Sequence, residues 1–128
     1  MEGWGITNDG EKLYMSDGSE KIYILNPETL KVEDFIGVYT NSSKIGSINE
    51  MEWINGKIWA NVYQKDVIAI IDPKTGAIEN VINCVELKSK VTQHPELDYF
   101  NGIAYNPATK TYFVTGKNWD KTFEITVD

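Results

Sequence analysis

Hydrophobic and polar residues alternate in short runs along most of this chain, and turn-forming dipeptides separate the runs. The clearest case is the stretch 49–66, which reads Asn-Glu-Met-Glu-Trp-Ile-Asn-Gly-Lys-Ile-Trp-Ala-Asn-Val-Tyr-Gln-Lys-Asp. Apolar residues alternate with polar ones on both sides of Asn55-Gly56, and this dipeptide tolerates the positive φ angles of a two-residue hairpin turn. The stretch therefore predicts two antiparallel β-strands joined by a tight turn.

Weaker copies of this hairpin occur before and after it with a constant period. Asp9-Gly10 precedes Asn55-Gly56 by 46 residues, and Asn26-Pro27 precedes Asp72-Pro73 by the same interval. Two independent landmarks with one period indicate a structural repeat. The strands that we expect cover residues 3–8, 12–16, 21–25 and 30–38, then 48–54, 57–62, 67–71 and 77–82, and finally 101–105, 111–115 and 122–127.

Four short strands repeated every 40–50 residues or so are typical of β-propeller blades. We therefore expect an all-β fold, a partial β-propeller of about two and a half to three four-stranded blades, with a shared apolar core between the blades. The predicted boundaries are a blade at 1–46, a blade at 47–99 and an incomplete blade at 100–128. The polar stretch 83–99 predicts a long loop with one short helical turn. Because so few blades cannot close a ring, either the chain is part of a longer protein or several copies complete the ring.

Composition excludes some classes of function. The 12 basic residues are all lysines and stand against 19 acidic residues, and the net charge of −7 argues against a nucleic-acid partner. No apolar run is long enough for a membrane span, so no membrane partner is expected. Cys84 and His94 are the only residues of their types. They offer no zinc-ligand spacing, and we expect no metal or other cofactor. No leader opens the chain, and its compartment stays unknown.

Five motifs resemble the plant and bacterial type of glutaminyl cyclase, the glutaminyl-peptide cyclotransferases. They are Glu2-Gly-Trp-Gly-Ile6, Asn49-Glu-Met-Glu-Trp53, Trp59-Ala-Asn-Val-Tyr-Gln-Lys-Asp66, Asn101-Gly-Ile-Ala-Tyr105 and Val114-Thr-Gly-Lys-Asn-Trp119. The resemblance covers essentially the whole chain and keeps the order of the motifs in the family. It implies a five-bladed propeller about twice as long as this chain. The chain then corresponds to roughly the C-terminal half of a protein that is commonly secreted or periplasmic.

The resemblance also implies an activity, the cyclisation of the N-terminal glutamine of a peptide to pyroglutamate with release of ammonia. This reaction needs a group that moves a proton and donors for a developing oxyanion, and the propeller type needs no catalytic metal. The resemblance places the catalytic glutamate of the family before Met1, and Glu2, Glu50 and Glu52 do not match its position. We therefore expect this chain alone to be inactive or nearly so.

Four site residues follow from the resemblance. It implies catalytic roles for Asn49, which contacts the substrate amide or its oxyanion, and for Lys117. It implies substrate binding by Trp4, which lines the pocket, and by Tyr63. Tyr63 stands where the family usually has tryptophan, so the aromatic wall is kept but is smaller and carries a hydroxyl group.

Other conspicuous residues receive structural interpretations. Aromatic residues in strands are more often core than pocket, and this interpretation is kept for Trp53 and Trp59. Asn101 is interpreted as a structural hydrogen-bonding residue between blades. The remaining interpretations are turn chemistry for Asp17 and Asp66, an exposed position without a role for His94, and core packing for Cys84.

Three functions stay open at this point. The first is the enzyme, active only together with its N-terminal blades. The second is a propeller module that binds peptides with an N-terminal glutamine but has lost the chemistry. The third is a structural repeat fragment that assembles with another copy of itself. For this chain alone, Tyr63 and the missing glutamate favour the binding module.

Overall fold

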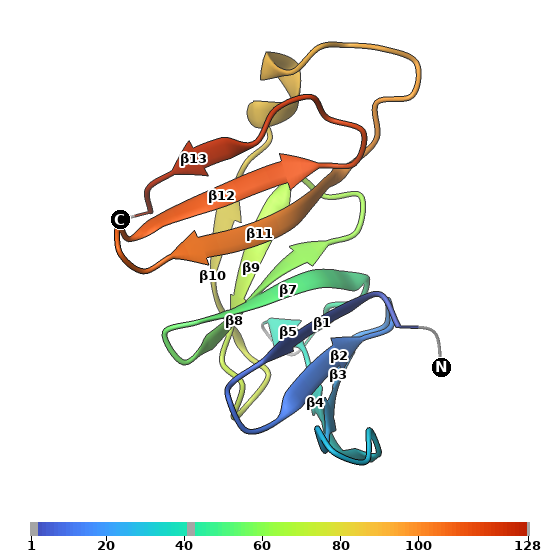
Figure 1. The fold of residues 1–128 in the computed structure, drawn as a ribbon. Coiled ribbons are helices and arrows are strands. Elements are labelled where there is room, and N and C mark those ends of the chain that lie inside the picture. The colour runs from blue at the N-terminus through green and yellow to red at the C-terminus, as the bar shows by residue number, and fades with distance from the viewer. Residues whose placement is uncertain (1–2, 41–42, 128) are drawn as a thin grey trace.

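The computed structural model describes residues 3–40 and 43–127 and consists almost entirely of antiparallel β-strands (Figure 1). Glu2, where the first motif begins, lies outside the described residues. The strands are β1 (Gly5–Asn8), β2 (Leu13–Ser16), β3 (Lys21–Leu25), β4 (Val32–Gly37), β5 (Tyr39–Thr40), β6 (Ser43–Lys44), β7 (Ile48–Ile54), β8 (Lys57–Val62), β9 (Val67–Ile71), β10 (Ile78–Asn83), β11 (Phe100–Asn106), β12 (Thr111–Gly116) and β13 (Phe123–Ile125). Within the described ranges, no helix is long and apolar enough to cross a membrane.

Three sheets follow one another along the chain, each with its strands in chain order: β1 to β4, β7 to β10, and β11 to β13. A small hairpin of β5 and β6 lies between the first two sheets in the sequence. The first strand of each sheet lies beside the first strand of the next, since β7 contacts both β1 and β11 (Figure 1). This is the arrangement of neighbouring propeller blades, in which the innermost strands surround a common axis. The blade boundaries themselves stay a prediction.

The hairpin at the centre of the sequence has the predicted turn. Asn55 and Gly56 have φ angles of 49° and 79°, and they join β7 directly to β8. Both positive angles belong to the turn type whose twist matches that of paired strands. The repeat is also visible as a contact, because the backbone N–H of Trp53 donates to Oγ1 of Thr7, 46 residues earlier, at 3.0 Å.

The second sheet is covered on both faces, which divides the core in two. One cluster packs between the first and second sheets and includes Ile22, Ile48 and Ile58, all fully buried. The other packs between the second and third sheets around Phe100 and Val114. The expected shared core is thus two separate inter-sheet layers, because successive residues of one strand point to opposite faces of its sheet.

Both strand tryptophans lie in these layers, as interpreted from the sequence. Trp59 is buried and stacks on Tyr112, with ring centroids 4.4 Å apart. Trp53 packs against the first cluster and stacks on Tyr14 at 5.4 Å. These contacts assign the two indole rings to packing between sheets and not to a binding site.

The outer face of the first sheet carries an apolar row and has no neighbouring sheet in the described residues. Ile6, Met15, Tyr23 and Phe35 form one row across all four strands of this sheet. Ile6 is 54% exposed and Phe35 is 52% exposed. An apolar row of this length on a sheet face usually marks a surface that another element covers.

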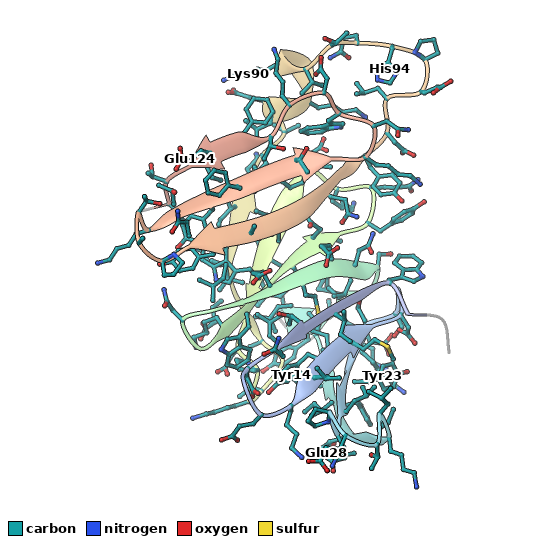
Figure 2. All side chains as sticks on the ribbon, in the orientation of Figure 1. Tyr14, Tyr23, Glu28, Lys90, His94 and Glu124 are labelled. Atoms are coloured by element: carbon teal, nitrogen blue, oxygen red, sulfur yellow. The ribbon has the colours of Figure 1, made fainter. Side chains whose placement is uncertain are left out.

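The loop between the second and third sheets carries the predicted helical turn, the 3₁₀ helix η1 (Leu87–Lys90). His94 lies in this loop (Figure 2) and is exposed, as expected, but the structure corrects the view that it has no role. Its Nδ1 accepts a hydrogen bond from the backbone N–H of Glu96 at 3.2 Å. Its Nε2 therefore carries the proton and donates to the carbonyl of Asn118 at 3.0 Å. His94 thus connects the loop to the turn that follows β12.

The two aspartates interpreted as turn residues differ. Asp17 accepts the backbone N–H of Ser19 through Oδ1 at 3.0 Å, which is the turn chemistry expected for it. Asp66 instead contributes its backbone carbonyl, which accepts the N–H of Cys84 at 2.8 Å. Its carboxylate makes no hydrogen bond with another described residue.

Cys84 is expected to react slowly with thiol reagents. Burial, and secondarily the charge of Asp66, raise its pKa from the ordinary 9.0 to about 11. At pH 8 the thiolate fraction falls from roughly one in ten to roughly one in a thousand, so we expect disulfide-exchange labelling about a hundredfold slower in native than in urea-unfolded protein. Because the folded pKa is raised, the same group lowers stability as the pH rises from about 9 to about 11. Equal labelling rates in the two states would contradict this packing role.

Candidate functional site

An open pocket of about 580 Å³ lies where the three sheets meet, and it is built from residues of all of them. Its lining residues are Trp4, Asn49, Tyr63, Tyr99, Asn101 and Lys117. All four site residues expected from the sequence are among them, although the first and the last, Trp4 and Lys117, are 113 residues apart in the chain. The structure thus brings together residues that only the family resemblance had connected.

Trp4 is positioned by the start of the first sheet. Its backbone N–H donates to the carbonyl of Ser16 at 2.9 Å, directly before β1. The ring lies on Gly18, where a Cβ atom would be 2.5 Å from Cζ2 of the indole, and Gly18 also has a φ of +85°. Glycine is therefore required at this position for two reasons, the backbone conformation and the space that the tryptophan ring fills.

Aromatic side chains form one wall of the pocket. The rings of Trp4 and Tyr63 lie 5.1 Å apart, and those of Tyr63 and Tyr99 lie 4.6 Å apart in an edge-to-face arrangement. Tyr63 follows β8 directly, and its backbone N–H donates to the backbone carbonyl of Ser47 at 2.7 Å, which holds it in place. Tyr99 was not singled out in the sequence. The only signal for it in the sequence is its position, two residues before the Asn101 motif. Its contact with Tyr63 forms only because two different sheets pack side by side.

The two pocket asparagines lie in β-bulges. The register between β7 and β8 shifts between Ile48 and Met51, which places Asn49 in the bulge. The register between β11 and β12 shifts between Phe100 and Ile103, which places Asn101 in another. A bulge sets two residues against one on the partner strand and re-aims a side chain, so both amides can reach the pocket from the innermost strands.

Asn49 is held tightly through its backbone. It is 8% exposed, and its carbonyl accepts the hydroxyl of Ser16 at 2.7 Å. Gly5 lies against the same carbonyl, since a Cβ at Gly5 would be 2.3 Å from this oxygen. The side-chain amide of Asn49 makes no hydrogen bond with another described residue, so its polar atoms are available to a ligand.

Lys117 is placed by a turn that is fixed on several sides. Its backbone N–H donates to the carbonyl of Tyr99 at 2.9 Å, and its Nζ lies 5.8 Å from the centroid of the Tyr99 ring. Trp119 covers Gly116 and donates from Nε1 to the carbonyl of Asp98 at 2.9 Å. The contact of His94 with Asn118 holds the other side of this turn. The ammonium group of Lys117 is exposed, but the backbone of this residue is anchored.

The structure corrects the interpretation of Asn101 as the hydrogen-bonding residue between blades. That bond is made by Asn61, a fully buried residue of β8, whose Oδ1 accepts the backbone N–H of Gly102 at 2.8 Å. Asn101 instead lines the pocket, and its Oδ1 is buried without a hydrogen-bond partner among the described residues. The sequence could not separate the two roles, because each asparagine lies in a predicted strand between two residues without polar side chains.

The pocket is rich in hydrogen-bond donors and its lining contains no acid. Of the six lining residues, Lys117 alone carries a formal charge at neutral pH. Burial, and secondarily the neighbouring charge of Glu50, raise the pKa of Glu52, but neither glutamate lines the pocket. No group of three or more His, Cys, Asp or Glu side chains that could hold a metal ion occurs in the part of the chain that is described. The lining suits an electron-rich group such as a carbonyl oxygen.

Comparison with known proteins decides the family. The family model described as glutamine cyclotransferase matches residues 1–127. The chain belongs to the glutamine cyclotransferase family. A curated relative, the glutaminyl-peptide cyclotransferase of Arabidopsis thaliana, is 40% identical over 126 residues. That alignment covers 97% of this chain and 39% of the relative.

Solved structures confirm the fold as part of a propeller. The crystal structure of Myxococcus xanthus glutaminyl cyclase matches with a TM-score of 0.93 and 34% identity, over 100% of this chain and 56% of that chain. Hydrazine synthase of Kuenenia stuttgartiensis matches with a TM-score of 0.65 at 17% identity, over 98% of this chain and 32% of that chain, and this likeness concerns the fold alone. The expected all-β partial propeller is thus confirmed. The chain spans less than two thirds of the length of each of these relatives.

Proposed function

We propose that this glutamine cyclotransferase chain forms the substrate-binding and oxyanion-stabilising side of a glutaminyl-peptide cyclotransferase. The observation that carries the proposal is the pocket in which Trp4, Asn49, Tyr63 and Lys117 meet. In the proposed reaction the α-amine of an N-terminal glutamine attacks its own side-chain amide carbon. A new C–N bond forms, the bond to the amide nitrogen breaks, and the proton lost by the amine leaves with that nitrogen as ammonia.

The donors of the pocket suit this chemistry. Attack on the amide carbon places negative charge on the amide oxygen, and N–H donors that already point at this oxygen stabilise the transition state. The free amide of Asn49 and the ammonium of Lys117 are such donors, and we assign them these catalytic roles. Trp4 and Tyr63 would pack on the methylene groups of the glutamine, with Tyr99 completing the wall next to the smaller Tyr63.

The proton transfer needs a group that the described pocket does not provide. A general base for an amine must come within hydrogen-bond reach of it, and none of the six lining residues is acidic. We therefore propose that this base belongs to blades outside these 128 residues. The same observation keeps a second candidate open, a module that binds glutamine-initiated peptides without turning them over.

The apolar row on the first sheet supports the involvement of further blades. Ile6 and Phe35 are about half exposed at its two ends. Another propeller blade, packed as the second sheet packs on the first, would cover this row. We propose that the rest of the same protein supplies that blade, because the chain spans only 39% and 56% of the two relatives. A stable assembly of two copies of this chain is the alternative, and the mass in solution distinguishes them.

The complete protein that contains these residues is expected to release ammonia from a peptide beginning with glutamine. The peptide should lose the mass of one ammonia, whereas the same peptide with an acetylated amine should not react, because its nitrogen can no longer attack. The 128-residue chain alone should show no turnover. Peptide binding without turnover by the complete protein would support the binding module instead. Absence of both would refute the proposed function.

A further inference from the structure

Asn101 and Asn49 occupy equivalent places in consecutive sheets. Both β7 (Ile48–Ile54) and β11 (Phe100–Asn106) are the first strand of their sheet, and each has asparagine as its second residue. In each strand the register shift lies between the first and the fourth residue. The repeated bulge thus presents an amide to the same pocket from two neighbouring innermost strands.

The amide of Asn101 is not used by the fold. Its Oδ1 is buried without a partner, and its Nδ2 makes no hydrogen bond with another described residue. Buried polar groups in native proteins nearly always have a partner, so an orphaned amide at a pocket indicates a role toward a ligand. The bulge that carries it depends on Gly102, whose φ of +124° is rarely adopted by other residues.

A second amide is suitably placed to orient Asn101. Asn61 accepts the N–H of Gly102 through Oδ1, so its side chain contacts the residue that directly follows Asn101. Its own Nδ2 is buried and also has no partner among the described residues. One of these two neighbouring amides offers an unpaired donor and the other an unpaired acceptor. The structure shows no hydrogen bond between Nδ2 of Asn61 and Oδ1 of Asn101, but such a bond would leave Nδ2 of Asn101 free to face the pocket.

We propose that Asn101 is a further catalytic residue, whose Nδ2 donates a hydrogen bond to the oxygen of the substrate side-chain amide. Asn61 is its positioning residue. The inference rests on the proposed function, because it assigns Asn101 to the same oxyanion as Asn49 and Lys117. It adds a third donor to the pocket, and this donor comes from the third sheet as that of Asn49 comes from the second.

The test is made in the complete protein with Asn101→Ala and with Asn101→Asp, which has nearly the same shape. We expect kcat for ammonia release from a glutamine-initiated peptide to fall about a hundredfold in Asn101→Ala, while KM changes less than about threefold. The kcat of Asn101→Asp should fall further, because an acceptor with a negative charge then faces the developing oxyanion. Asn106→Ala is the matched control. It lies at the other end of β11, where its Oδ1 accepts the N–H of Ala108, and it should keep full kcat.

The outcomes separate the two proposals. If the unsubstituted protein is active and both Asn101 variants retain its kcat, the assignment of Asn101 is wrong and the proposed function stands. A loss of kcat that follows an equal loss of thermal stability in both variants would show a structural role and would also overturn the assignment. If the unsubstituted protein neither binds nor turns over the peptide, the proposed function fails, and the role of Asn101 fails with it.

Discussion

Replacing Lys117 by alanine in the complete protein is expected to lower kcat/KM for a glutamine-initiated peptide by about a thousandfold. Lys117 carries the only formal charge among the residues that line the pocket. Its backbone is anchored to Tyr99 at 2.9 Å, so the variant should lose the ammonium group without moving the turn. Steady-state ammonia release at saturating and at low peptide concentration measures the effect on kcat and on kcat/KM separately.

Two further variants make the result specific to this ammonium group. Lys117→Arg keeps a positive charge and should retain part of the activity, although its planar head group cannot occupy the same position. Lys74→Ala removes an exposed lysine from the turn between β9 and β10, at the end of β9 remote from Tyr63, and should leave turnover unchanged. Activity of Lys117→Ala within threefold of the unsubstituted protein would refute the assignment of Lys117 to the site.

The strands could be predicted because their signals are local. Alternation of apolar and polar residues and the turns at Asn55-Gly56 and Asp72-Pro73 depend on neighbouring residues only, and the structure has strands where these signals predicted them. The strands β5 and β6 were not separately predicted, because two residues are too few to show a period. The division of the core into two layers follows from the pairing of sheets, which no single strand reveals.

The lining of the pocket was predicted only in part, and the reason lies in the bulges and in contacts between sheets. Trp4, Asn49, Tyr63 and Lys117 were found through motifs, and the structure places them in one pocket. Asn101 was given the role that Asn61 has. A side chain in a bulge departs from the alternation that sequence reasoning relies on, so the direction of Asn101 could not be derived from its neighbours. Tyr99 was missed because its contact with Tyr63 joins two different sheets, and no single strand reveals such a contact.

The contact between the first two sheets also depends on backbone geometry that no pattern of side chains announces. Gly76 lies in the turn after β9 and is buried, with a φ of +83°. Its carbonyl accepts the N–H of Tyr39 at 3.0 Å, which links the end of the first sheet to the second. A Cβ at this position would lie 1.9 Å from the carbonyl oxygen of Gly37. Two backbone segments approach so closely here that no side chain fits between them.

Gly76→Ala is therefore expected to destabilise the complete protein by about 3 kcal/mol, the sum of a left-handed conformation at a residue with a side chain and an overpacked contact. Guanidinium unfolding measures the loss as a shift of the midpoint at unchanged slope. Gly56→Ala is the matched control, because its φ is +79° and a Cβ there meets nothing within 4 Å. It should lose only the conformational part, about 1 kcal/mol. Equal losses in the two variants would show that the sheets can separate at Gly76 without cost, and that this contact does not fix the angle between the blades that form the pocket.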